Sequence, residues 1–553
     1  CRAAAGAAAG ARAGAGARGR RAGRAGTPGR GACGTCAAAA GAPGPGSAGG
    51  GGGRLQKLQR RAAQLLPMTS LFFLLSFNNT ILDSTKDTLV ITAVGGAQQV
   101  PFLTLYVVLP ISVFVVASFV RLSARFRRET VFNILLLSFM AFFGVFSFFV
   151  YPNREAFHLH TAADYLESVL PAGFLGFTSV VRQWTYSLFY CMAELWGDVM
   201  LSLQFWMLAN ATTREEDAPL LYPLFGLGAN AAQMVAGRLL KYMPALMAGT
   251  NYDVQLRALT GAFLFTGIVT LAAHAWISRI QPAVGTAAPE GSAAGGGGDA
   301  APSPAPKEEE PASFLATVRT LLKNPALSAL AVMSVAQGVA TNLLEVAWKS
   351  ELRVLYPQPA AYSAFMGDVA SICGLCTATM MLVSPYLFSR IRWSQMANIT
   401  PKILISGGTV FFLAAIARVY FGVYNAGTQF ALASLGGGMF IFSRAAKFGF
   451  FKPSEEMVYL KMDDESRSTG KATVDVIGAQ FGKSVSSLTQ QVLFIISGGS
   501  IAKVLPVMLT LFVAMLRQWI SCVRSLADTM SMDTKVDSGG GADEADGKVF
   551  GLS

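Results

Sequence analysis

Four ionisable residues interrupt apolar stretches of this 553-residue chain, and they are the side chains best placed to do chemistry. They are Lys86, Glu194, Glu345 and Lys483. An ionisable group at membrane depth costs roughly 2.5–3.5 kcal/mol on insertion scales, so its default interpretation is functional. Two ammonium groups in a low dielectric need counter-charges, which two glutamates provide while a site is empty. The four residues therefore predict a site for an anionic ligand, such as a phosphorylated one.

A second set of charged residues in apolar stretches is open to two interpretations. It comprises Asp198, Arg238, Asp368 and Asp475. Each residue could belong to the same site, or it could lie at the membrane surface with its charged end in water. The sequence leaves both interpretations open.

Enzyme, metal and cofactor chemistry find little support. His158 and His160, separated by one Leu, supply two metal ligands at most. The run that ends in Gly482-Lys483-Ser484 resembles a phosphate-binding loop, but Ile477 stands where that motif needs its first Gly. No nucleophile elbow or paired-carboxylate signature is present. We expect a protein that is not an enzyme, with no catalytic residue, metal or cofactor.

The elements that must position these residues are transmembrane helices. Hydrophobic residues make up 52% of the chain and charged residues 14%, against about 25% charged in globular proteins. A span needs about 20 apolar residues, and this rule predicts an all-α integral membrane protein with about twelve spans. The predicted spans are 65–83, 101–120, 130–151, 173–208 (one long or broken helix), 219–240, 258–278, 327–347, 362–388, 397–417, 421–443, 474–498 and 501–521.

Low-complexity segments divide the chain. Residues 1–61 form a basic, acid-free leader typical of an organelle transit peptide, although a disordered tail would have the same composition. We expect a disordered linker at 281–312 and a disordered acidic tail at 523–553. Two six-helix halves, 62–280 and 313–522, remain. This is the layout of a secondary transporter with its binding site near the membrane midplane, between the halves.

The net charge of +12 does not indicate nucleic-acid binding. Eleven of the 44 basic residues lie in the leader, and the first acidic residue is Asp83, so the rest of the chain is nearly neutral. Basic residues are also concentrated in the loop 121–128, and the positive-inside rule then places both termini and the central linker on one side of the membrane. The partners that we expect are the lipid bilayer and an anionic solute.

The two halves share a weak internal repeat. Asp83 and Lys86 end the first predicted span, and Glu345 and Lys349 end the seventh. Each pair places an acid and a lysine within one helical turn.

Several ordered blocks resemble the nucleotide transporter family of plastids and obligate intracellular bacteria, the ATP:ADP antiporters. The resemblance extends over most of residues 66–520. The blocks are Thr85–Ala93, Val150–Glu155, Trp184–Tyr190 with Ala193–Gly197, Tyr222–Asn230, Glu345–Ser350, Tyr362–Asp368 and Gly470–Ala472.

The resemblance implies a fold similar to the major facilitator superfamily and exchange of ATP for ADP, with phosphate exchanged by some members. The family's transport-critical residues fall on the same two lysines and two glutamates, and Asn230 is similar to a further substrate contact. The resemblance and the leader together imply the inner envelope membrane of a plastid (chloroplast). The oligomeric state is open, and a monomer is sufficient for this mechanism.

Three departures from the family pattern concern selectivity. The chain has Ala479–Val485 where members usually have Asn-Pro-Leu-Gly-Lys-Ser-Gly, and it has Arg444 where they usually have Lys. Charges also move in the stretch 452–456. A proton-coupled or one-way nucleotide importer, or a carrier of another phosphorylated metabolite on the same fold, therefore stays open as an alternative.

Overall fold

The computed structural model describes residues 50–213, 217–280, 324–423, 425–462, 474 and 482–533, and it describes the backbone alone at 50–64, 218–220 and 280. These residues are helical with short connections and contain no strand. The linker predicted at 281–312, Asp475 and the family block at Gly470 lie outside them. Most of the leader and most of the acidic tail also lie outside them.

The first half consists of helices that follow the predicted spans, with π-helical or 3-10 turns inside several of them. Its elements are α1 (Gly50–Ile91), η2 (Gly96–Gln98), α2 (Gln99–Phe102), η3 (Leu103–Val108), α3 (Leu109–Arg125), α4 (Arg128–Val145), η4 (Phe146–Val150), α5 (Arg154–Phe157), α6 (His160–Val169), η5 (Ala172–Phe174), α7 (Leu175–Arg182), α8 (Trp184–Trp196), η6 (Gly197–Phe205), α9 (Trp206–Thr212), α10 (Ala218–Leu246) and α11 (Tyr252–Ile280).

The second half follows the same plan. Its elements are α13 (Pro325–Leu355), α14 (Pro359–Arg390), α15 (Trp393–Phe421), α16 (Ala426–Ala446), η8 (Lys447–Phe451), α17 (Lys452–Leu460), α19 (Gly482–Ser497) and α20 (Ile501–Thr529).

Eight helices among the described residues are long and apolar enough to cross a membrane. The other four predicted spans correspond to the segment α7–α9 and to α10, α16 and α19. These segments carry Asp198, Asn230, Arg444 and Lys483, respectively, which all line the cavities described below. The described part of α19 has only 16 residues, fewer than a span needs. In the other three segments polar residues lower the hydropathy, and these residues are tolerated because they face an internal cavity.

Two boundaries differ from those predicted. Helix α1 begins at Gly50, inside the expected leader, and α20 continues to Thr529, past the end expected at 522. The fourth predicted span, expected to be one long or one broken helix, is broken at Gln183, between α7 and α8. Hydropathy locates the apolar centre of a helix, and it does not detect polar turns that continue the helix beyond the membrane.

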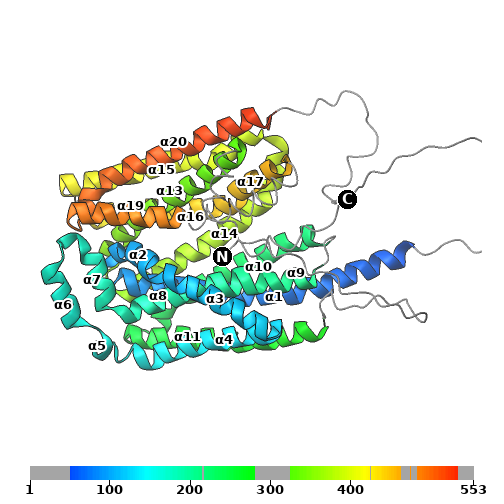
Figure 1. Ribbon diagram of the computed structural model, residues 1–553, viewed down its shortest axis with the longest axis horizontal. Helices are drawn as coiled ribbons and strands as arrows, with labels where there is room; N and C mark the ends of the chain where they lie inside the picture. The colour runs from blue at the N-terminus through cyan, green and yellow to red at the C-terminus, as the bar shows by residue number, and fades with distance from the viewer. Residues whose placement is uncertain are drawn as a thin grey trace, which may run out of the picture.

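Each half has an apolar core of its own. One cluster contains buried residues from 68–277, among them Trp196 and Phe263. Another contains Trp348 and Trp519 and is built almost wholly from 326–526. Figure 1 shows the two groups of helices one above the other, with α10 and α14 where they meet. The separate cores allow each half to move as a body.

Glycines let the halves approach closely along α10 and α14. A Cβ atom added to Gly237 of α10 would lie 2.5 Å from the carbonyl oxygen of Gly367 in α14, and the converse distance is also 2.5 Å. Small residues at such crossings let helix backbones touch in membranes. The α10–α14 crossing is therefore a backbone contact between the halves.

At one end the halves close on each other. Gln98 Nε2 donates to the carbonyl oxygen of Gly499 at 2.5 Å, and Gln491 Nε2 donates to that of Pro101 at 3.0 Å. A Cβ on Gly173 would lie 2.4 Å from Ile495 Cα. This closed end is the one where α1 and α19 end, so any opening lies toward the start of α1.

Candidate functional site

A cavity of about 790 Å³ lies between the two halves, with walls from α1, η6, α10, α14 and α16. Two smaller cavities of about 330 Å³ and 190 Å³ adjoin it, since Arg444 and Lys483 line all three. The largest cavity extends along α1 from Asp87 to Phe72, away from the closed end. Its volume lies in the range of pockets that bind small organic ligands.

One turn of α1 brings three charged side chains to the cavity wall. Lys86 Nζ lies 2.7 Å from Asp83 Oδ1 and also donates to the carboxylate of Glu194 in α8. The same ammonium lies 4.7 Å from the centre of the Tyr190 ring. Only 6% of the Lys86 side chain is exposed, so two carboxylates and a ring enclose its charge.

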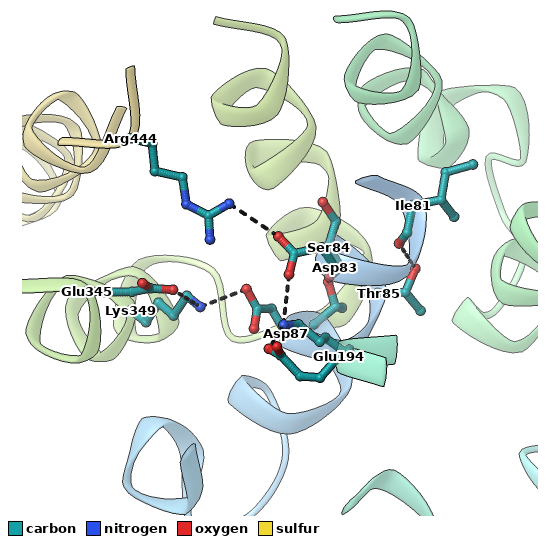
Figure 2. Close-up of polar contacts among 11 residues, drawn as sticks. Ile81, Asp83, Ser84, Thr85, Asp87, Glu194, Glu345, Lys349 and Arg444 are labelled. Carbon is teal, nitrogen blue, oxygen red and sulfur yellow. Dashed lines mark hydrogen bonds and ion pairs between the residues drawn. The ribbon is translucent and has the colours of Figure 1, made fainter. Parts of the chain in front are cut away.

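Asp87, the third charged residue of this turn, forms an ion pair with a lysine of the other half. Lys349 Nζ of α13 lies 2.7 Å from Asp87 Oδ2 and 2.6 Å from Glu345 Oε1. The Lys349 and Asp87 side chains are only 5% and 4% exposed. Figure 2 shows Lys349 between Glu345 and Asp87. The predicted repeat is thus an ion pair in both halves, Asp83–Lys86 and Glu345–Lys349.

Two further cations are open to the cavity. Arg444 Nη1 of α16 lies 3.6 Å from Asp83 Oδ2, and 44% of its side chain is exposed. Lys483 is the second residue of α19 and is exposed, and no ion pair joins it to another residue that the structure describes. Gly482 lies against the backbone of α13 at Val335 and Gly338, so Lys483 is directed into the space between the halves.

The far part of the large cavity is aromatic and uncharged. Phe72, Trp206 and Tyr222 line it, with ring centroids 6.0 Å apart for Phe72–Trp206 and 5.1 Å apart for Trp206–Tyr222. Asn230 lines the same wall and is only 8% exposed, and its Nδ2 donates to Met381 Sδ at 3.4 Å. The cavity therefore has one charged end and one aromatic end with an amide.

The structure brings the predicted site residues together. Lys86, Glu194, Glu345 and Lys483 all line the 190 Å³ cavity, and Asn230 lines the adjoining large one. Asp87 and Arg444 were not predicted from the sequence to be site residues. Lys349 was recognised only as part of the internal repeat. The one feature of the sequence that could have identified these three residues is that each lies at the end of an apolar run.

The second set of charged residues separates into two groups. Asp198 lines the 190 Å³ cavity with the main four. Arg238 and Asp368 instead pair with each other, with Arg238 Nη1 3.5 Å from Asp368 Oδ1, and neither lines the described cavities. Lys241 Nζ lies 2.7 Å from the same carboxylate.

The histidine pair has a third neighbour that the sequence did not reveal. The carboxylate of Glu155 joins His158 and His160, with one potential ligand atom of each within 4.8 Å of the others. The two histidines supply two potential ligands, as expected from the sequence, and Glu155 adds a third. The Glu155 and His160 side chains are 76% and 47% exposed, and Arg154 Nε lies 3.9 Å from the same glutamate.

Comparison with solved structures identifies the fold. The chain superposes on a bacterial homologue of the iron transporter ferroportin in an inward-facing state with a TM-score of 0.50 and 13% identity, covering 84% of this chain and 99% of that one. A D-xylose–proton symporter matches with a TM-score of 0.50 and 11% identity, covering 82% and 96%. At these identities the likeness concerns the fold alone, which is all-helical and similar to the major facilitator superfamily.

Sequence comparison identifies the family. ADP,ATP carrier protein 1, chloroplastic, of Arabidopsis thaliana is 35% identical over 473 residues, which are 84% of this chain and 73% of that protein. ADP,ATP carrier protein 1 of Chlamydia trachomatis serovar D is 35% identical over 477 residues, 84% and 88% of the two chains. The TLC ATP/ADP transporter family matches residues 58–530. Together with the charged cavity between two helical halves, this match establishes that the chain belongs to the TLC ATP/ADP transporter family, whose members are membrane transporters and not enzymes.

Proposed function

We propose that this chain exchanges ATP for ADP by alternating access, with the nucleotide in the cavity between the halves. The observation that carries the proposal is the polarity of that cavity. Lys86, Lys349, Arg444 and Lys483 surround one end, and aromatic rings line the other. A nucleotide has the same polarity, with negative phosphates at one end and a flat base at the other.

The phosphates bind at the charged end and the adenine at the aromatic end. Phosphate oxygens accept charge-assisted hydrogen bonds from Lys86 and Lys483. In the empty cavity Glu194 balances the charge of Lys86, and Glu345 balances that of Lys349. Asn230 is suited to the adenine edge, because an asparagine amide can donate to and accept from N7 and N6 of adenine. The aromatic neighbours Trp206 and Tyr222 provide faces for stacking.

An empty cavity disfavours the change of access. Without nucleotide, closing the halves brings Lys483 toward the other cations with no anion between them, which is costly in a low dielectric. A bound phosphate chain removes that cost. Exchange, rather than one-way transport, is the expected result.

The first experiment is uptake of radiolabelled ATP into liposomes that contain the full chain, with and without internal ADP. We expect uptake to require internal ADP. The Lys483→Gln variant should reduce uptake by about 10- to 100-fold, since a hydrogen bond to a charged group contributes roughly 1.5–3 kcal/mol. Lys503→Gln is the matched control, because Lys503 is also exposed but lies in α20 outside the cavity linings.

The outcome separates the alternatives. Uptake that is indifferent to internal nucleotide points to a one-way or proton-coupled importer. Competition by other phosphorylated metabolites, and not by ADP, points to another cargo. If Lys483→Gln exchanges as fast as Lys503→Gln, the assignment of Lys483 to the phosphates is wrong.

We propose the inner envelope membrane of a plastid as the location. The support is the composition of residues 1–61, which are basic and contain no acidic residue. Relatives from chloroplasts and from chlamydiae are about equally similar, so similarity does not decide between an organelle and a bacterial membrane. Fluorescence microscopy of residues 1–61 fused to a fluorescent protein in plant cells tests the proposal, and a cytosolic signal would contradict it.

A further inference from the structure

Arg444 differs from Lys86 and Lys349 in its position and from Lys483 in having a carboxylate partner among the described residues. Like Lys483, it lines all three cavities, and 44% of its side chain is exposed. Its guanidinium carbon lies 4.9 Å from the centre of the Phe440 ring, one turn earlier on α16. The ring therefore packs against the guanidinium, which lies in the space between the halves.

The carboxylates of the site are unevenly shared among the cations. Lys86 and Lys349 each have two carboxylates, with ion-pair distances of 2.7 Å or less, and are almost wholly enclosed. The only carboxylate that pairs with Arg444 among the described residues is Asp83, at 3.6 Å. Asp83 also holds Lys86 at 2.7 Å, so its charge is divided between two cations. Arg444 therefore has the weaker hold on a carboxylate and the better access to a ligand.

We propose that Arg444 binds the terminal phosphate of the nucleotide and that Asp83 occupies the place of this phosphate while the cavity is empty. This inference rests on the proposed function. The planar guanidinium presents several N–H donors in a fork that matches phosphate oxygens, which a lysine does not offer. A terminal phosphate carries more negative charge than the shared carboxylate, and so it displaces Asp83 from Arg444.

This displacement acts on the contact between the halves. Asp83 belongs to α1 in the first half and Arg444 to α16 in the second, and Figure 2 shows their ion pair spanning the space between the two elements. When the phosphate binds Arg444, the Asp83–Arg444 ion pair between the halves is replaced by an ion pair between Arg444 and the ligand. A ligand that removes such a contact shifts the equilibrium toward the other state of the carrier.

The test is calorimetric titration of the purified full chain with ADP and with AMP, without magnesium. We expect Arg444→Gln to weaken ADP binding by about tenfold or more, and to weaken AMP binding less. Arg444→Lys should recover part of the ADP affinity. Arg238→Gln is the matched control, because Arg238 also pairs with one aspartate of the other half, at 3.5 Å, and does not line the cavities.

The Asp83→Asn variant distinguishes a competing carboxylate from a structural one. A competitor for the phosphate site should, when neutralised, make ADP bind more tightly than to the wild type, and a merely structural aspartate would not. Thermal unfolding of every variant checks that it is folded. If Arg444→Gln binds ADP as Arg238→Gln does, or if Asp83→Asn binds it more weakly, the inference is overturned while the proposed function stands. Failure of the wild type to bind ADP overturns both.

Discussion

At the residue scale, the Asp87–Lys349 pair is the most deeply buried charge contact between the halves. Lys349 lies within 2.7 Å of Asp87 and within 2.6 Å of Glu345, so one ammonium balances two carboxylates. Removal of one member of a buried pair leaves an uncompensated charge, which costs about 3–5 kcal/mol. The two members are not equivalent in this respect, because within the described part of the chain Lys349 pairs with two carboxylates and Asp87 with one cation.

We therefore expect Lys349→Met to destabilise the protein more than Asp87→Asn does. The first change leaves two carboxylates without their cation, and the second leaves Lys349 still paired with Glu345. The measurement is the midpoint of thermal unfolding in detergent, with Lys503→Met as the control for loss of an exposed lysine. An equal or larger effect of Asp87→Asn would contradict this account.

The sequence indicates those residues whose energetic cost can be judged from their immediate neighbours in the chain. Lys86, Glu194, Glu345 and Lys483 are recognisable because a charge inside an apolar run is expensive whatever it contacts. Arg444 and Asp87 gain their significance from partners on other helices, and no spacing rule connects α1 with α13 or α16. For the same reason the sequence could not separate Asp198, which faces a cavity, from Asp368, which does not.

At the element scale, the α10–α14 crossing depends on glycine. A Cβ on Gly237 would lie 2.5 Å from the Gly367 carbonyl oxygen and 2.7 Å from the Ser371 nitrogen, both in α14. These neighbours are backbone atoms, which cannot move away by a change of rotamer as the end of a side chain can. The contact is possible only while both helices lack side chains at this point.

We predict that Gly237→Ala lowers the thermal unfolding midpoint and slows ATP/ADP exchange, because the added methyl forces the halves apart. Gly261→Ala in α11 is the control, since a Cβ there meets nothing within 4 Å. That change should be neutral or stabilising, because alanine is favoured over glycine within a helix by about 1 kcal/mol. The two variants are compared by thermal unfolding and by exchange in liposomes. Similar behaviour of both would show that the crossing tolerates a larger separation.

Apolar run length predicted where the helices lie but not how they end or break. The helix predicted over 421–443 continues from α16 through the π-helical turn η8 into α17, which ends at Leu460. Likewise α1 continues past 83 to Ile91, through charged residues that a hydropathy window rejects. Those polar turns are stabilised by partners on other helices. A prediction from apolar run length does not include such partners, because they are distant in the sequence.

At the scale of the whole molecule, the cavity reaches from the charged turn of α1 toward Phe72, and the opposite end is closed by contacts such as Gln98–Gly499. The structure therefore represents one of the two access states, the one that faces the side where α1 begins.

We predict that a cysteine at Ser202, a half-buried residue on the wall of the large cavity, reacts with a charged thiol reagent only from the side where α1 begins, and that ADP protects it. The background should lack the seven native cysteines. Ser168→Cys is the control, because Ser168 is exposed on α6, beyond the cavity. It should react from the opposite side without protection by ADP. Labelling of sealed vesicles of both orientations measures this, and reaction of Ser202→Cys from the closed side alone would reverse the assigned orientation.

The pairing of Asp87 with Lys349 also bears on how the protein is made. Helix α1 enters the membrane early in synthesis, but Lys349 emerges only after the rest of the first half, the 281–312 segment and most of α13 have been translated. At about 5–20 residues per second, this delay is on the order of tens of seconds. During that time the nascent chain holds a carboxylate at membrane depth without its cation. Complete assembly of α1 must therefore wait for the second half, and a chain that stops before α13 should be a substrate for membrane quality control.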